Sequence, residues 1–208
     1  MLASISKLLA LFFPPQCYGC HKEGFSLCSS CLERCRKSID TPAIFITSVY
    51  CFRDPLIKKA IHAIKYFHRR DLIEPLTKEL ANELKSINFA QQNIPFVIIP
   101  IPMPLLRKYM RGYNQAELIA QELAKQCSLT INTTALARLH APKRQVTTKT
   151  KSERLRNQHG SFKVISSVCN MHILLVDDVT TTGATLVEAR KALLKSGAIT
   201  VRAVTIAH

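Results

Sequence analysis

The chain has 208 residues, of which 47% are hydrophobic and 21% are charged, so its composition is that of a globular protein and excludes a disordered chain. Twenty-nine lysines and arginines stand against 14 aspartates and glutamates, which gives a net charge of +15. A fold does not require this imbalance, and it indicates a polyanionic partner: a nucleic acid, a phosphorylated ligand or an anionic membrane.

The longest apolar stretch runs from Leu8 to Pro15. It is far shorter than the ~20 residues that a helix needs to cross a bilayer. No small-x-small cleavage site follows it, so we do not interpret it as a signal peptide. We expect residues 2–13 to form a short amphipathic helix that packs on the rest of the protein, without a membrane span and in the cytoplasm.

A paired cysteine motif comes next, with the pattern C-x2-C-x7-C-x2-C at Cys17, Cys20, Cys28 and Cys31. Two such pairs close in sequence favour four thiolates around one tetrahedral, structural Zn²⁺ that would hold residues 14–36 together and do no chemistry. Disulfides are the alternative, and a reducing compartment disfavours them. A redox C-x-x-C would normally stand alone before a helix. His21 and Cys35 are spare ligands, and three isolated cysteines are interpreted as core residues: Cys51, Cys127 and Cys169.

The chain is predicted to divide into a zinc-finger module with a flanking helix over 1–45 and a larger domain over 46–208. Residues 44–52 read as a strand, because β-branched and aromatic residues are bounded by turn formers. A helix should begin directly after Asp54, which suits the N-cap position. A second helix is predicted over 71–87.

Strands and helices alternate through the second half. Continuous apolar runs are typical of strands buried on both faces. The expected strands are 96–101, 127–133, 172–176 and 200–206, and the expected helices are 113–126 and 183–196. This order predicts an α/β fold with a parallel sheet flanked by helices, and a ligand crevice at the carboxyl ends of its strands. Residues 138–160 are polar and basic, which suggests a long loop.

The strand at 172–176 leads into a run of acids, hydroxyls and one glycine, and then into a helix. A helix start offers free N–H groups and the positive end of a dipole, which together can hold a phosphate. Two acids would repel that phosphate, but carboxylates accept hydrogen bonds from the vicinal hydroxyls of a ribose. The alternative is a capped helix with incidental acids. The candidate ligand-binding residues are Asp177, Asp178, Val179, Thr180, Thr181, Thr182, Gly183, Ala184 and Thr185.

This stretch looks like the motif with which type I phosphoribosyltransferases bind 5-phosphoribosyl-1-pyrophosphate (PRPP). The order of motifs along the whole chain also resembles the ComF (ComFC, or GntX-like) family of competence-associated proteins. The motifs are the cysteine module, Ile64-Lys65-Tyr66, residues 100–104 (PIPMP), residues 111–115 (RGYNQ), then Gln145, Arg154, Asn157 and Phe162.

The resemblance implies a type I phosphoribosyltransferase-like core, with Asp177 and Asp178 holding the ribose diol of PRPP in the presence of Mg²⁺. It also implies a role in natural transformation, the uptake and chromosomal integration of DNA, with competence-machinery proteins as candidate partners.

Cations gather in two places beside this motif. The prolines of residues 100–104 lack N–H groups, so nearby side chains must supply positive charge. The candidate DNA- or phosphate-binding residues are Arg107, Lys108, Arg111, Lys143, Arg144, Lys149, Lys151, Arg154 and Arg156. Aromatic rings on which bases of a single strand can stack are Tyr66, Phe67, Tyr109, Tyr113 and Phe162.

Three functions remain open on the sequence alone. The first, which the charge and the resemblance favour, is a DNA-handling competence protein that binds single-stranded DNA on a basic surface and PRPP in its pocket. The second is a phosphoribosyltransferase, an enzyme of the glycosyltransferase class, acting on an unidentified acceptor. The third is a PRPP-sensing regulator that binds nucleic acid.

Overall fold

The computed structural model describes residues 14–86, 96–139 and 160–208. The predicted helix over 2–13 lies outside them, and so do Lys143, Arg144, Lys149, Lys151, Arg154 and Arg156. Within the described ranges, no helix combines the length and apolar character needed to span a bilayer.

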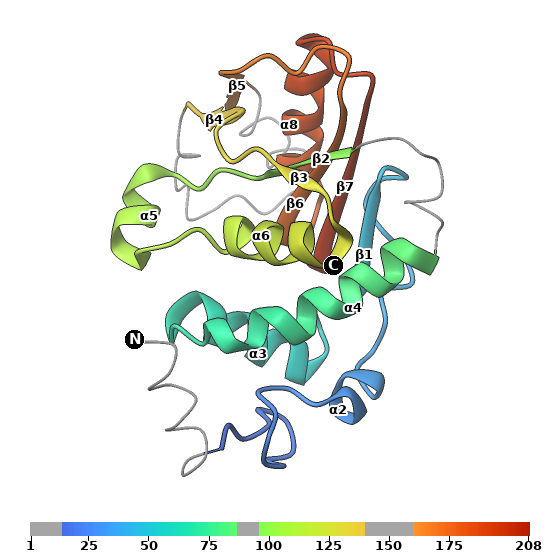
Figure 1. Ribbon diagram of the computed structural model, residues 1–208, viewed down its shortest axis with the longest axis vertical. Helices are drawn as coiled ribbons and strands as arrows, with labels where there is room; N and C mark the ends of the chain where they lie inside the picture. The colour runs from blue at the N-terminus through green and yellow to red at the C-terminus, as the bar shows by residue number, and fades with distance from the viewer. Residues whose placement is uncertain (1–13, 87–95, 140–159) are drawn as a thin grey trace.

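A five-stranded sheet forms the centre of the fold (Figure 1). Each neighbouring pair of its strands is parallel, as the alternating pattern predicts. The strands, in spatial order, are β1 (Ile46–Tyr50), β7 (Thr200–Ala207), β6 (His172–Val179), β2 (Phe96–Pro100) and β3 (Thr130–Ile131). The central position of β6 explains its unbroken run of apolar residues, because both of its faces are covered.

Helices cover both faces of this sheet. The four longest within the described residues are α3 (Pro55–Tyr66), α4 (Ile73–Ser86), α6 (Gln115–Cys127) and α8 (Ala184–Lys195). Leu174 and Val176 of β6 share a core with α3, α4 and α6, whereas Ile173 and Leu175 share the opposite core with α8. Alternate side chains of one strand therefore hold the two helical layers to the sheet.

Helix α3 begins where the sequence predicts. Asp54 Oδ1 accepts hydrogen bonds from the N–H groups of Leu56 and Ile57 at 3.0 and 3.2 Å, and Pro55 occupies the first helical position. A 3-10 turn, η1 (Arg70–Leu72), then leads into α4. Cap and proline together set the direction in which α3 leaves β1.

The cysteine module packs on these helices. It contains the short helix α2 (Ser29–Glu33), and its Leu27 and Leu32 belong to the same hydrophobic core as α3 and α4. Asp54 Oδ2 also accepts a hydrogen bond from Arg36 N–H at 3.0 Å, which joins the module to the start of α3. The prediction of three isolated core cysteines is wrong for Cys169, which is exposed, while Cys51 and Cys127 are partly buried.

Three features differ from the predicted elements. A helix, α5 (Leu105–Arg111), follows the proline-rich loop and buries none of its residues. Strands β4 (Leu136–Arg138) and β5 (Phe162–Val164) pair antiparallel in a separate small sheet. Strand β6 continues through both acids to Val179, because its pairing with β7 extends that far.

Candidate functional site

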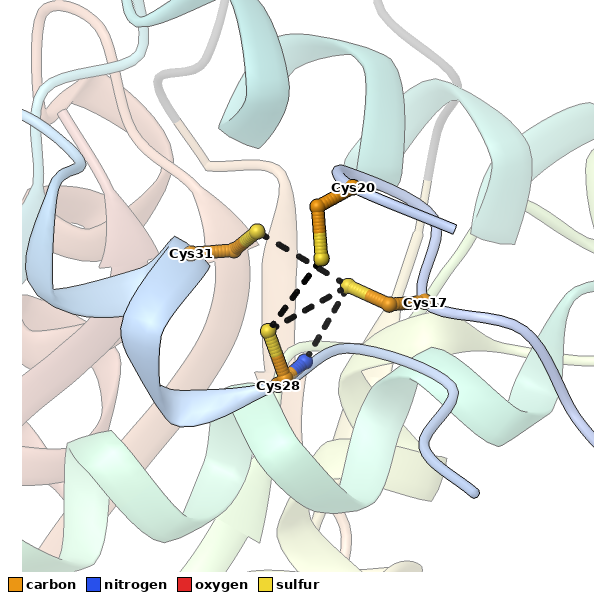
Figure 2. Close-up of side chains that lie close together, drawn as sticks. All are labelled: Cys17, Cys20, Cys28 and Cys31. Carbon is orange, nitrogen blue, oxygen red and sulfur yellow. Dashed lines mark hydrogen bonds between the residues drawn. The ribbon is translucent and has the colours of Figure 1, made fainter. Parts of the chain in front are cut away.

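The four predicted metal ligands meet at one point (Figure 2). All four sulfur atoms lie within 4.8 Å of one another. Cys17 Sγ is 3.6 Å from Cys28 Sγ and 3.8 Å from Cys31 Sγ, and Cys20 Sγ is 3.7 Å from Cys28 Sγ. Four sulfurs bound at ~2.3 Å to one tetrahedral ion lie about 3.8 Å apart, so this spacing fits a metal with four thiolate ligands.

The electrostatics of the cluster also fit a cation. Burial disfavours the thiolate of Cys17, but the N–H groups of Cys20, Cys28 and Gly19 outweigh it and lower the Cys17 pKa to about 6. Burial and the neighbouring cysteines raise the pKa of Cys31 to about 12. Four thiolates this close cannot all ionise without a positive ion between them.

The spare ligands lie outside the cluster. Cys35 Sγ donates to the carbonyl of Cys31 at 3.3 Å, and burial, followed by the charge of Asp54, raises the Cys35 pKa to about 12. His21 is not among the grouped ligands. The four residues of the motif therefore form the candidate metal site by themselves.

A cleft of about 300 Å³ opens at the carboxyl ends of β2 and β6, where the alternating pattern predicts a ligand crevice. The loop after β2 lines one side with Ile101 to Pro104. Asp177, Asp178 and Thr185 of the predicted PRPP motif line another. The remaining wall includes cationic, amide and aromatic side chains: Lys65, Tyr66, Arg107, Arg111, Asn114, Gln115 and Arg138.

The acid pair is held rigidly at the end of β6. Asp177 Oδ1 accepts a hydrogen bond from Asp178 N–H, and Asp178 Oδ1 accepts one from Val179 N–H, both at 2.8 Å. Asp178 Oδ2 is ion-paired with Lys65 Nζ, from the last turn of α3, at 2.7 Å. Burial and the charge of Asp178 raise the pKa of Asp177 to about 7. Asp177 is therefore a carboxyl that titrates near neutral pH.

We expect Asp177→Asn to remove the loss of unfolding free energy that ionisation of the buried Asp177 carboxyl causes as pH rises. The native protein keeps a proton on Asp177 that the unfolded chain releases, so the free energy of unfolding falls as pH rises from about 4 to about 7. Near pH 8 the asparagine variant should be more stable than the wild type by about 2 kcal/mol, after allowance for water at the cleft mouth. The difference should vanish near pH 4. Urea unfolding at both pH values measures it, and an equal difference at both would contradict the assignment.

The turn between β6 and α8 requires glycine at one position. Gly183 has a φ of 73°, and a Cβ there would lie 3.1 Å from Pro42 and 3.2 Å from Ile46. Both the left-handed backbone and the close packing therefore exclude a side chain. The turn presents the N-terminus of a 12-residue helix, α8, next to Thr185, an arrangement that can hold a phosphate.

The other residues of the predicted motif take different places. Val179 packs on the core, and Thr180 is buried with its N–H bonded to the Ala207 carbonyl at 3.1 Å. Thr182 Oγ1 accepts a hydrogen bond from Ala184 N–H at 3.4 Å. The carbonyl of Thr181 accepts one from His208 Nε2 at 3.0 Å. These residues shape the turn, while the two acids and Thr185 face the cleft.

Cations face the acid pair across the cleft. Arg107 and Arg111 line it as predicted, whereas Lys108 is ion-paired with Glu117 at 3.3 Å and does not line it. Two further cations line the cleft: Lys65, which belongs to the Ile64-Lys65-Tyr66 motif, and Arg138, the last residue of β4 and the first of the basic residues 138–160; neither was among the predicted site residues. Burial lowers the pKa of Arg138, and the charge of Asp177 opposes that shift. The cleft thus combines carboxylates with several cations at close range.

A buried amide is the second feature absent from the predicted site. Gln115 is only 2% exposed and lines the cleft. Its Oε1 accepts a hydrogen bond from Arg111 Nη1 at 2.5 Å, but no described group accepts from its Nε2. An unpaired buried donor costs about 1 to 3 kcal/mol. Nε2 is therefore placed to donate to a ligand in the cleft.

The predicted stacking rings separate into two sets. Tyr113 and Phe162 are buried, and the Tyr113 hydroxyl donates to the carbonyl of Ile64, so neither ring can stack on a base. Tyr66, Phe67 and Tyr109 are exposed, as single-strand binding requires. The alternating sequence pattern could not distinguish the two sets, because aromatic residues occur in both environments.

A parallel sheet whose central strand ends in an acid pair, followed by a glycine turn and a helix, defines a phosphoribosyltransferase-type protein. The family model "Phosphoribosyl transferase domain" matches residues 74–208, and the chain belongs to this family. The match begins within α4, so α3 and the cysteine module precede it.

Individual relatives match a larger share of the chain than the family model does. The chain is 29% identical over 189 residues to DNA utilization protein YhgH of Escherichia coli O157:H7, covering 90% of this chain and 80% of that protein. It is 31% identical over 150 residues to competence protein ComFC of Bacillus subtilis, covering 72% of this chain and 58% of that protein. A hypoxanthine phosphoribosyltransferase from Staphylococcus aureus aligns with a TM-score of 0.40 and 22% identity, over 64% of this chain and 61% of that one.

Proposed function

We propose that the protein is a competence-associated DNA-handling protein that binds PRPP in the cleft and single-stranded DNA on its basic surface. One observation carries the PRPP proposal: Asp177, Asp178 and Thr185 face Arg107, Arg111 and Arg138 across a single cleft. The names of the relatives, which are competence and DNA utilization proteins, support the DNA role. The net charge of +15 supports a polyanionic partner.

Each part of PRPP has a chemically suitable group in this cleft. The carboxylates of Asp177 and Asp178 accept hydrogen bonds from the ribose hydroxyls. The start of α8 and Thr185 bind the 5-phosphate. Arg107 and Arg111 bind the pyrophosphate, which the proline-rich loop is poorly equipped to hold through backbone N–H groups. Mg²⁺, when bound, neutralises part of the pyrophosphate charge.

The cysteine cluster is proposed to hold a structural Zn²⁺. The sulfur spacing fits the ion, and all four positions of the tetrahedron are filled by cysteines. No open position is left for a substrate, so this ion stabilises the module and does no chemistry. The cluster needs reduced thiols, which the cytoplasm maintains.

Gln115→Met should weaken PRPP binding about tenfold, because it keeps the volume of the side chain and removes the Nε2 donor. The free energy of unfolding should change little, because the relief of an unpaired Nε2 is offset by loss of the hydrogen bond from Arg111 to Oε1. Isothermal titration with PRPP and Mg²⁺ measures the affinity, and urea unfolding measures the stability. Unchanged PRPP affinity would show that Gln115 serves packing alone.

Fluorescence anisotropy of a labelled single-stranded oligonucleotide, titrated with the full chain near physiological salt, tests the DNA part of the proposal. Tight, sequence-tolerant binding that weakens as salt rises would support it. Absence of binding at micromolar protein would overturn it and favour a phosphoribosyltransferase for a small acceptor.

A further inference from the structure

A second hollow adjoins the first. It has a volume of about 380 Å³ and is lined by Lys65, Tyr66, His68, Arg107, Met110 and Arg111. Four of these residues, Lys65, Tyr66, Arg107 and Arg111, also line the cleft with the acid pair. The two hollows are therefore parts of one groove between the end of α3 and helix α5, which we call the α3–α5 groove.

Two exposed rings lie together at the α3 side of this groove: Tyr66 lines it, and Phe67 follows Tyr66 at the end of α3. Tyr66 is 59% exposed and Phe67 65%. The ring of His62 lies 4.6 Å from that of Tyr66 and 5.6 Å from that of Phe67, which orders these two side chains on the surface. The guanidinium of Arg111 lies 5.3 Å from the ring centre of Tyr66. A flat ring next to a cation can stack on a nucleobase while the cation meets its phosphate.

Helix α5 forms the other side of the groove and buries none of its residues. Its apolar side chains Leu105, Leu106, Tyr109 and Met110 are all exposed, and Met110 lines the second hollow. Exposed apolar side chains grouped on one helix are typical of an interaction site. The lining of the second hollow contains three permanent cations and no acidic residue, so its charge complements a polyanion rather than a neutral or basic protein segment.

We propose that single-stranded DNA binds in the α3–α5 groove, with bases stacked on its exposed rings, and that it competes there with PRPP. This inference rests on the proposed function and places both ligands on one set of cations. Lys65, Arg107 and Arg111 line both hollows, so the phosphates of a strand and the pyrophosphate of PRPP require the same three side chains. Each ligand must then weaken the other by an equal factor.

The test measures anisotropy of a labelled oligothymidylate with the full chain, with and without saturating PRPP and Mg²⁺. We expect PRPP to weaken single-strand binding at least tenfold in the wild type. In Asp177→Ala/Asp178→Ala, DNA should still bind but PRPP should have no effect. Wild-type DNA affinity that PRPP leaves unchanged would overturn the shared groove and leave the proposed function standing.

Substitution of the rings at the groove tests where the single-stranded DNA binds. Tyr66→Ala/Phe67→Ala removes the two exposed rings that pack on His62 at the groove, and should weaken single-strand binding at least tenfold. Phe25→Ala, which removes an exposed ring of the cysteine module, is the matched control and should change nothing. If Tyr66→Ala/Phe67→Ala binds DNA normally while Arg154→Ala/Arg156→Ala binds it weakly, the basic residues within 138–160 form the DNA surface and this inference is wrong. If the wild type binds no DNA at all, the proposed function itself fails.

Discussion

Replacement of Cys28 by serine is expected to lower the melting temperature of the whole protein by roughly 10 °C. Cys28 is buried and its N–H donates to Cys17 Sγ at 3.3 Å, so it is a backbone support of the cluster as well as one of the four proposed metal ligands. Loss of one thiolate leaves a tetrahedral metal site incomplete. The module has few other stabilising contacts of its own, since its only helix within the described residues spans five residues.

The effect should spread beyond the module. Gly19 lies so close to Leu56 of α3 that a Cβ there would be 3.0 Å from the Leu56 side chain. The ring of Tyr18 is approached by Lys59 at 4.6 Å and by Arg69 at 4.9 Å. The cluster therefore supports α3, whose last turn carries Lys65 to the acid pair. We expect Cys28→Ser to weaken PRPP binding as well.

Differential scanning fluorimetry and a zinc assay of the purified chain check this result. Wild-type protein should release one zinc ion per chain on treatment with a chelator and a thiol reagent, and its melting temperature should then approach that of the variant. Cys169→Ser is the control, because Cys169 is exposed and lies outside the cluster. A metal-free wild type that melts at the original temperature would remove the structural role.

The parallel sheet could be predicted because the amino-acid composition of its central strands indicates that they are buried on both faces. Strand β2 and residues 173–176 of β6 are continuous apolar runs, and a strand without polar alternation must be covered on both faces. The cysteine cluster and the glycine turn were equally accessible, since the spacing of thiols and the position of Gly183 express local geometry.

Helix α5 could not be predicted in the same way. Amphipathic periodicity signals burial of one face, and α5 buries nothing. Its end is nevertheless marked, because Gly112 adopts a φ of 78° at the position after the last helical residue. This helix forms because its residues favour a helical backbone, and not because it buries an apolar face.

The roles of Lys65 and Gln115 depend on tertiary contacts. Lys65 meets Asp178 only because α3 packs against the end of the sheet that carries the acids. Gln115 is buried at the first position of α6, where a polar residue is ordinarily exposed. Both residues lie in motifs that the sequence analysis singled out, but the ion pair of Lys65 and the burial of Gln115 follow only from how α3 and α6 pack on the sheet.

Conversion of both acids to alanine, Asp177→Ala/Asp178→Ala, is expected to reduce PRPP affinity by at least 100-fold while the fold persists. The two carboxylates are the only acidic side chains in the described lining of the cleft, and they are the acceptors proposed for the ribose hydroxyls. Two charge-assisted hydrogen bonds at about 1.5 to 3 kcal/mol each account for a loss of this size. Titration calorimetry with PRPP and Mg²⁺ measures it, and Asp40→Ala, at an exposed position outside the cleft, is the control.

The effect of Asp177→Ala/Asp178→Ala on DNA binding distinguishes a role of the acids in binding PRPP from a general loss of structure. Removal of Asp178 releases Lys65 from its 2.7 Å ion pair, which frees a cation that the α3–α5 groove offers to phosphate. Single-strand affinity should therefore be kept or increased, and the number of counterions released should not fall. A folded double variant that lost DNA binding together with PRPP binding would show that the acids organise the groove itself. That result would contradict the proposal that PRPP and DNA compete for the cations of the groove.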